Sequence, residues 1–213
     1  MSIRVNTVAR AAHGARRRAK TRQGLIDAAI GVVAQHGSDL TIERVALAAK
    51  VSRGTFYNYF PSLDQLLVAL VEHLADEARQ DLATRLGHIT NPAQQLAASA
   101  HYYLRRARRE PLWAWAVQNL QGLHILHFPT VPRVFRSIHR RGVASGDFQN
   151  ADPTAAYVVI AAALRAAQRS TLMGQTHAAF DQDVVAFILA GLGMPFGTAR
   201  QLSRETVDTA GPG

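Results

Sequence analysis

Apolar residues recur along most of this chain at intervals of three and four, the spacing of an amphipathic helix. One stripe near the start comprises Leu25, Ala28, Ala29, Val32 and Val33. A longer stripe comprises Leu66, Leu67, Leu70, Val71, Leu74, Ala78 and Leu82. No segment shows the alternation of apolar and polar residues that is typical of a half-buried strand. The pattern therefore predicts an all-α fold.

Turn and cap residues divide this pattern into about nine helices. The first is expected over about 15–36, where Gly37 is a natural stop, and the second begins after Thr41. The third is expected over 53–60 after Ser52, and the fourth runs from Ser62 to the break at Gly87. Asn91-Pro92 and Asp152-Pro153 each place a cap before a first-turn proline. The later helices are expected over about 92–109, 111–123, 131–141, 153–173 and 180–192, with room for a short one after Pro195.

Residues 41–60 carry the most informative pattern in the chain. They read as two short helices joined by a tight turn at Ala49-Lys50-Val51. Val51 at the end of this turn, with Phe56 and Phe60 of the second helix, forms a side that packs inward. The outward side carries Arg53, Thr55, Tyr57, Asn58 and Tyr59. Such side chains suit a helix that lies in the major groove of DNA.

The charge of the chain is concentrated near its start. The formal net charge is +9, and no acidic residue precedes Leu25. The basic residues before that point are Arg4, Arg10, Arg16, Arg17, Arg18, Lys20 and Arg22. Beside a helix-turn-helix, such an arm indicates a polyanionic partner. The alternatives are a solvated, disordered leader or an organellar transit peptide.

Composition excludes several classes of protein. The chain has no cysteine, which removes disulfides and thiolate metal sites. It has no apolar run of about 18 residues, the length that a membrane span needs. The leader also lacks the apolar stretch of a secretory signal, so the cytoplasm is the expected location.

The order of these elements resembles the TetR family of bacterial transcription regulators, strongly over about 22–70 and weakly beyond. The resemblance is carried by Leu25-Ile26-Asp27-Ala28-Ala29, Gly37, Thr41, Val45-Ala46, Ala49, Val51 to Phe60, and Leu66-Leu67. It implies a homodimer in which each subunit has a three-helix DNA-binding head and a larger helical body. It further implies that the body holds a small-molecule pocket, and that ligand binding releases a repressor from DNA.

Two positions depart from the family pattern. Lys50 stands where a glycine is common in the turn, which costs roughly 1 kcal/mol if the backbone there needs a positive φ. Leu63 stands where a lysine often touches phosphate, so that contact should be absent.

The expected DNA contacts comprise two sets with different chemistry. Arg53 can pair with guanine in the major groove, and Gly54 lets the backbone approach the duplex. The arm should follow phosphates or enter the minor groove and read little sequence. The complete expected set is Arg16, Arg17, Arg18, Lys20, Arg22, Thr41, Lys50, Arg53, Gly54, Thr55, Tyr57, Asn58 and Tyr59.

The middle of the chain gathers aromatic and polar residues that suit either a ligand pocket or a helical core with a few satisfied polar tips. The candidate ligand residues are Tyr103, Trp113, Gln118, His124, Phe128 and Tyr157. His124 and His127 lack a nearby third ligand, so no metal site is expected. The run Arg105, Arg106, Arg108 and Arg109 is interpreted as a solvated face, from which one arginine can turn into the pocket or bind acidic groups.

These observations predict a domain plan and a function. The plan is a basic, disordered leader over 1–14, a DNA-binding domain over 15–61, a ligand-binding and dimerisation body over 62–196, and a tail over 197–213. The alanine-rich segment 153–173 and the apolar segment 184–192 are expected to form the dimer surface, with ordinary packing inside one subunit as the alternative. The predicted function is a ligand-released repressor that acts on double-stranded DNA. A non-specific DNA-coating protein is the alternative. A helical-bundle enzyme is disfavoured, because no nucleophile motif, carboxylate pair or phosphate loop occurs, and no cofactor is expected.

Overall fold

The computed structural model describes residues 2–122, 130–149 and 151–207. Over these ranges the chain forms ten α-helices, one short 3-10 helix and no strand, which confirms the all-α prediction. The helices are α1 (Ser2–His36), η1 (Gly37–Asp39), α2 (Ile42–Ala48), α3 (Arg53–Tyr57), α4 (Leu63–Leu86), α5 (Pro92–Arg109), α6 (Pro111–Gly122), α7 (Thr130–Ser145), α8 (Pro153–Leu172), α9 (Phe180–Gly191) and α10 (Phe196–Thr206).

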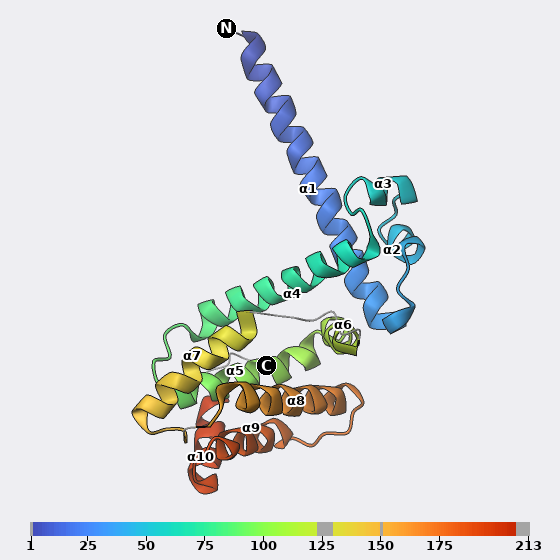
Figure 1. The fold of residues 1–213 in the computed structure, drawn as a ribbon. Helices are drawn as coiled ribbons and strands as arrows, with labels where there is room; N and C mark the ends of the chain where they lie inside the picture. Colours follow the sequence, from blue (N-terminus) through green and yellow to red (C-terminus); the bar gives the residue numbers. More distant parts are fainter. Residues whose placement is uncertain (1, 123–129, 150, 208–213) are drawn as a thin grey trace.

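The head consists of α2, α3 and the second half of α1, which pack with the start of α4 and with α6 around one apolar core (Figure 1). Leu25, Val45 and Phe56 are fully buried in this core. The predicted caps are confirmed, since Thr41 Oγ1 accepts a hydrogen bond from the Arg44 amide at 3.3 Å. Ser52 Oγ likewise accepts from the Thr55 amide at 3.0 Å. The recognition helix α3 ends at Tyr57, three residues earlier than predicted.

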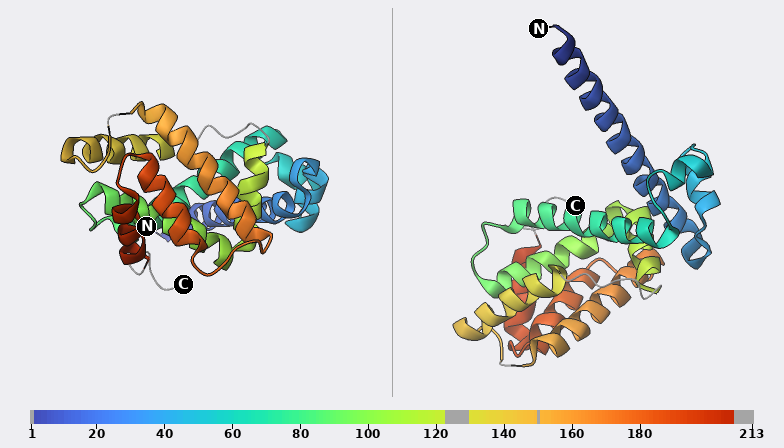
Figure 2. Two further views of the ribbon diagram at one scale, coloured as in Figure 1. Left: turned by 90° about the horizontal axis from the view of Figure 1, so that it is seen from below. Right: turned by 45° about the horizontal axis from the view of Figure 1, so that its top comes forward.

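The first helix is longer than the sequence predicts. The expectation of a disordered leader over 1–14 is wrong for residues 2–14, which continue α1 as one helix. This stretch contains no proline to break a helix, and Arg4, Ala9, Arg10, Ala11 and Ala12 are good helix formers. As a result, α1 extends well past α2 and α3 and projects away from the body (Figures 1 and 2).

Helix α4 joins the head to the body. It begins at the Ser62 cap, and Leu66 and Leu70 in its first turns are fully buried in the core of the head. Its second half lies alongside the body, in which α5 and α7 to α10 pack around a second core (Figure 1), while α6 packs against the core of the head. Leu104, Val185 and Leu189 are fully buried there.

The short helix that the sequence allowed after Pro195 is α10. It packs against α9 and α5, so its residues belong to the body and not to the separate tail expected over 197–213, of which 208–213 lie outside the described residues. Ala199 and Ser203 are fully buried, and the Ser203 carbonyl lies 2.9 Å from Nε2 of the buried His101. This segment reads as polar because its inward positions include Ser203 and Thr206. Its helical spacing nevertheless places them on one face.

No helix in the described ranges is long and apolar enough to cross a membrane.

Candidate functional site

The outward face of α3 is free in the subunit. The Arg53 side chain is 61% exposed and Tyr57 is 46% exposed, while Phe56 between them is fully buried. Gly54 and Asn58 are also exposed. The body does not cover this face, because α3 lies on the outer side of the head, away from α5 to α10 (Figure 1). These four residues can therefore reach a duplex.

Thr55 and Tyr59 are more constrained than the rest of the set. Thr55 is half-buried, and its hydroxyl lies 2.9 Å from Ser52 Oγ, so it takes part in the cap of α3. Tyr59 is half-buried and packs against the core of the head. Their DNA contacts remain predictions, and these two residues lie at the edge of the face.

Arg53 has a partner on the neighbouring helix. Its Nη1 lies 3.0 Å from Oε1 of Glu43, in the first turn of α2. A hydrogen bond with Tyr57, followed by attraction from Glu43, raises the pKa of Arg53 above its ordinary value. Glu43 was not predicted to be a partner of Arg53. The signal that could have found the pair is that both residues open the two helices of one helix-turn-helix.

The basic arm on α1 lies against the far end of α3. Arg18 Nη2 donates to the Asn58 carbonyl at 3.2 Å, and its guanidinium lies 5.5 Å from the centre of the Tyr59 ring. Arg22 lies 5.0 Å from the centre of the Phe60 ring. The remaining members of the expected set on this helix, Arg16, Arg17 and Lys20, are exposed. The fold thus brings the arm and the recognition helix to one side of the head.

The turn between α2 and α3 places Lys50 at a φ of 56°, the left-handed region that favours glycine. The backbone at Lys50 therefore has the positive φ for which a cost of roughly 1 kcal/mol relative to glycine was predicted. Lys50 is exposed, as is Thr41, whose hydroxyl is already engaged in capping α2.

Three of the candidate ligand residues converge in the body. The Tyr103 hydroxyl donates to Gln168 Oε1 at 3.0 Å, and Gln118 Nε2 donates to the same oxygen at 2.8 Å. Trp113 packs against Tyr103 in an edge-to-face arrangement, with ring centres 5.8 Å apart. Burial raises the pKa of Tyr103 well above its usual range. The effector cluster, defined as Tyr103, Trp113, Gln118 and Gln168, thus joins α5, α6 and α8.

Two buried polar atoms of this cluster have no hydrogen-bond partner, Trp113 Nε1 and Gln168 Nε2. Both are donors, so the cluster can satisfy an acceptor on a bound molecule. Gln168 is fully buried and was missed from the sequence. The available signal was a polar residue within the apolar, alanine-rich stretch of α8.

The arginine run on α5 is not a uniformly solvated face. Arg106 is buried, with Trp113 stacked on its guanidinium at 4.3 Å and Glu77 Oε2 lying 3.0 Å from its Nη2. Burial lowers the pKa of Arg106, but hydrogen bonds to Glu77 and Glu110 raise it above the ordinary value. Arg108 forms a bidentate pair with Asp181. Neighbouring arginines of this run thus have different partners, since Arg106 meets Glu77 and Glu110 and Arg108 meets Asp181.

The other ligand candidates do not join this cluster. Tyr157 packs against Phe135 in the second core, with ring centres 5.7 Å apart. His124 and Phe128 lie outside the described residues, as does His127. In the described part of the chain, no group of three or more His, Asp or Glu side chains could share a metal ion.

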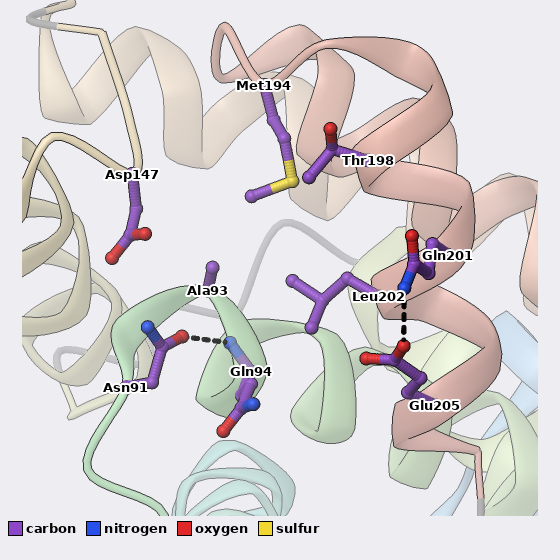
Figure 3. Close-up of a pocket in the computed structure, with 9 residues that line it drawn as sticks. All are labelled: Asn91, Ala93, Gln94, Asp147, Met194, Thr198, Gln201, Leu202 and Glu205. Carbon is purple, nitrogen blue, oxygen red and sulfur yellow. Dashed lines mark hydrogen bonds between the residues drawn. The ribbon is translucent and has the colours of Figure 1, made fainter.

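Two hollows occur elsewhere on the body. One, of about 620 Å³, runs between α8 and α9 and is lined by apolar residues such as Val159 and Phe187. The other, of about 260 Å³, lies between the start of α5 and α10 (Figure 3). Several of its polar groups engage one another, since Asn91 Oδ1 accepts from the Gln94 amide at 2.8 Å and Gln201 Nε2 donates to Glu205 Oε1 at 2.9 Å. Neither hollow includes a residue of the effector cluster.

Comparison with known proteins covers most of the chain. The model of bacterial regulatory proteins of the tetR family matches residues 25–70, and that of the tetracyclin repressor-like C-terminal domain matches 91–205. The HTH-type transcriptional regulator BetI of Brucella anthropi is 35% identical over 97 residues, which are 44% of this chain and 50% of that protein. The BetI of Agrobacterium fabrum is 33% identical over 81 residues, 38% of this chain and 39% of that one. The chain thus spans at most about half the length of these curated relatives.

Solved structures share the fold over a longer stretch. RolR in complex with resorcinol superposes with a TM-score of 0.68 at 25% identity, covering 89% of this chain and 95% of RolR. The fatty acid degradation regulator FadR from Bacillus halodurans has a TM-score of 0.68 at 20% identity, covering 82% of this chain and 97% of FadR.

Proposed function

The chain belongs to the tetR family of bacterial regulatory proteins, and on that premise we propose that it is a sequence-specific, DNA-binding transcription regulator. It acts as a repressor that a small-molecule ligand releases from an inverted-repeat operator, and it has no enzymatic role. The observation that carries the proposal is the free outward face of α3, with Arg53 and Tyr57 exposed above a buried Phe56. Its place of action is the cytoplasm, where a bacterium keeps its DNA.

The head supplies base contacts and phosphate contacts from different elements. Arg53 presents the donor fork that pairs with guanine O6 and N7, and Asn58 offers an amide to a base edge or a phosphate. The exposed Arg16, Arg17 and Lys20 of α1, together with Lys50, are placed to meet phosphates. Phosphate contacts set orientation and general affinity, whereas base contacts set the choice of sequence.

An inverted-repeat operator requires two heads related by a two-fold axis. The exposed apolar face of α8 and α9, which carries Val158, Val159 and Phe187, supports a homodimer through these helices. Paired heads of this kind must lie about one DNA turn, roughly 34–36 Å, apart, or at a multiple set by the family.

The effector cluster supports an aromatic or otherwise apolar ligand that carries one or two hydrogen-bond acceptors. Trp113 and Tyr103 supply aromatic surface, while Trp113 Nε1 and Gln168 Nε2 are buried donors without partners. The similarity to RolR, solved with resorcinol, points the same way. Through Arg106, the cluster touches Glu77 on α4, the helix that carries the head, so a shift of this helix can change the spacing of the heads.

The central test is selective DNA binding. Genomic fragments captured by the full chain should contain an inverted repeat, and Arg53→Ala should weaken binding to that repeat by about 1–3 kcal/mol while barely affecting random DNA. Arg204→Ala, an exposed charge on α10, is the matched control. Equal binding of all fragments would favour the coating protein, and absence of binding at low salt would reject both DNA-binding functions.

The ligand part is tested separately with a panel of small phenols that includes resorcinol. A binder should raise the melting temperature of the protein and release it from the captured repeat. Gln168→Leu should abolish both effects and leave DNA affinity unchanged. A compound that binds tightly and leaves operator affinity unchanged would contradict release by this site.

A further inference from the structure

One contact in the head is not explained by DNA affinity. Glu43 opens α2, Arg53 opens α3, and their side chains pair across the helix-turn-helix at 3.0 Å. Both side chains are more than half exposed, at 56% and 61%. An ion pair this exposed contributes little to folding stability. It also places a carboxylate on the surface that is proposed to face a polyanion, where it opposes binding.

The contact makes sense if it fixes the direction of Arg53. A free arginine at the start of a helix has many rotamers, and a bidentate contact with guanine uses only a few of them. The Glu43 carboxylate lies 3.0 Å from Nη1 of Arg53 and so holds one guanidinium nitrogen from the neighbouring helix. This contact limits the rotamers of Arg53, and the side chain remains 61% exposed, so its other nitrogens can still meet a base.

We propose that Glu43 is a positioning residue that sets sequence selectivity by holding Arg53 in its base-reading geometry, at the expense of general affinity for DNA. The proposal rests on the proposed function and deepens it. It predicts an opposite effect on two quantities. Loss of the carboxylate should relax base preference, and it should tighten binding to DNA of any sequence.

A direct role for Glu43 makes a different prediction. A carboxylate can itself accept a hydrogen bond from the cytosine amino group in the major groove. In that case Glu43 and Arg53 would each govern a separate base pair, and the two substitutions would act independently. If Glu43 acts through Arg53, both substitutions relax the same base pair, and the double variant is no worse than Arg53→Gln alone.

The experiment is selection from a fully randomised duplex library with sequencing, which requires no prior operator. The full-length protein is compared with Glu43→Gln, Arg53→Gln and the double variant. Asp64→Asn is the matched control, because it removes one exposed carboxylate from the first turn of α4, outside the α2–α3 pair. Binding of each variant to a random duplex is measured at one fixed salt concentration.

We expect Glu43→Gln to reduce the preference at one base pair per half-site by about 5- to 100-fold, at the position that Arg53→Gln also relaxes. Its affinity for random DNA should rise at least as much as that of Asp64→Asn, which should keep the wild-type preference. An unchanged preference profile in Glu43→Gln would overturn the proposal. So would relaxation at a base pair that Arg53→Gln leaves intact. A wild-type profile without any preference would refute the regulator function itself, before any variant is compared.

Discussion

Lys50 holds the turn between α2 and α3 in a left-handed backbone conformation, with a φ of 56°. A side chain with a Cβ is strained in this conformation, and glycine is not. The turn is otherwise well satisfied, because the Lys50 amide donates to the Leu47 carbonyl at 3.0 Å and the Val51 amide donates to the Ala46 carbonyl at 2.9 Å. The strain therefore belongs to this residue alone.

Lys50→Gly should accordingly raise the free energy of unfolding by about 1 kcal/mol. Lys50→Ala keeps the Cβ and should leave it nearly unchanged. Urea denaturation followed by circular dichroism measures both. Equal stabilities of the two variants would show that the turn is unstrained. Both variants lose the charge, so DNA affinity should fall equally in both if Lys50 meets a phosphate.

Arg17 is an exposed residue of the α1 arm, whereas Arg18 and Arg22 lie over the rings of Tyr59 and Phe60. Arg17→Ala should weaken binding to operator and random DNA by similar factors, because phosphates are common to both. It should also lower the slope of log affinity against log salt by about 1. Fluorescence anisotropy over a salt series measures this, with Arg204→Ala as the control. A slope equal to that of the wild type would place Arg17 away from phosphate.

Single elements differ in how far the sequence determines them. Helix caps are local, so Thr41, Ser52, Asn91 and Asp152 located helix starts correctly. The buried side of α3 was predictable at Phe56 and its exposed side at Arg53 and Tyr57, whereas Thr55 and Tyr59 were predicted to face outward and are half-buried. The extent of α1 was underestimated, because high charge was taken as a sign of disorder although the residues are good helix formers.

Contacts between distant elements could not be predicted. The effector cluster depends on Gln168, which lies 65 residues beyond Tyr103 and meets it only through the packing of α5 against α8. Arg106 illustrates the same limit, because a run of four arginines gives no indication of which one faces Glu77 on α4. Periodicity assigns a residue to a face of its helix, and tertiary packing decides what that face meets.

Near the end of α7, Gly142 packs closely against the Phe148 ring, and this contact predicts how each of two glycine substitutions changes stability. A Cβ at Gly142 would lie 2.0 Å from Phe148 Cδ2, whereas a Cβ at Gly31 in α1 would meet nothing within 4 Å. Gly142→Ala should therefore destabilise the protein by about 1–3 kcal/mol, because the buried Phe148 ring must move. Gly31→Ala should stabilise it by up to about 1 kcal/mol through helix propensity. Thermal melts of both variants test this, and a stable Gly142→Ala protein would mean that the ring relocates freely.

In the whole subunit, α4 runs from the head into the body, and two body helices make further contacts: α6 with α1, and α5 with α4. Asn119 of α6 donates to the Val33 carbonyl near the end of α1 at 2.8 Å, one residue after Gln118 of the effector cluster. Arg106 joins Trp113 to Glu77 on α4. The cluster thus lies next to both routes from the body to the head. A ligand that repositions α6 or Arg106 acts on the elements that carry α3.

The assembly of two such subunits is the property on which paired DNA contacts depend. Phe187 is 67% exposed in the apolar face of α8 and α9, so Phe187→Glu should place a charge in the proposed dimer surface and yield monomers. Operator affinity should then fall sharply, because the two heads no longer bind as one unit. Leu112→Glu, at a residue 56% exposed on α6, introduces the same charge outside this face and should leave the dimer intact. Analytical ultracentrifugation with titration of the captured repeat measures both quantities. A dimeric Phe187→Glu protein with full operator affinity would move the interface to another face of the body.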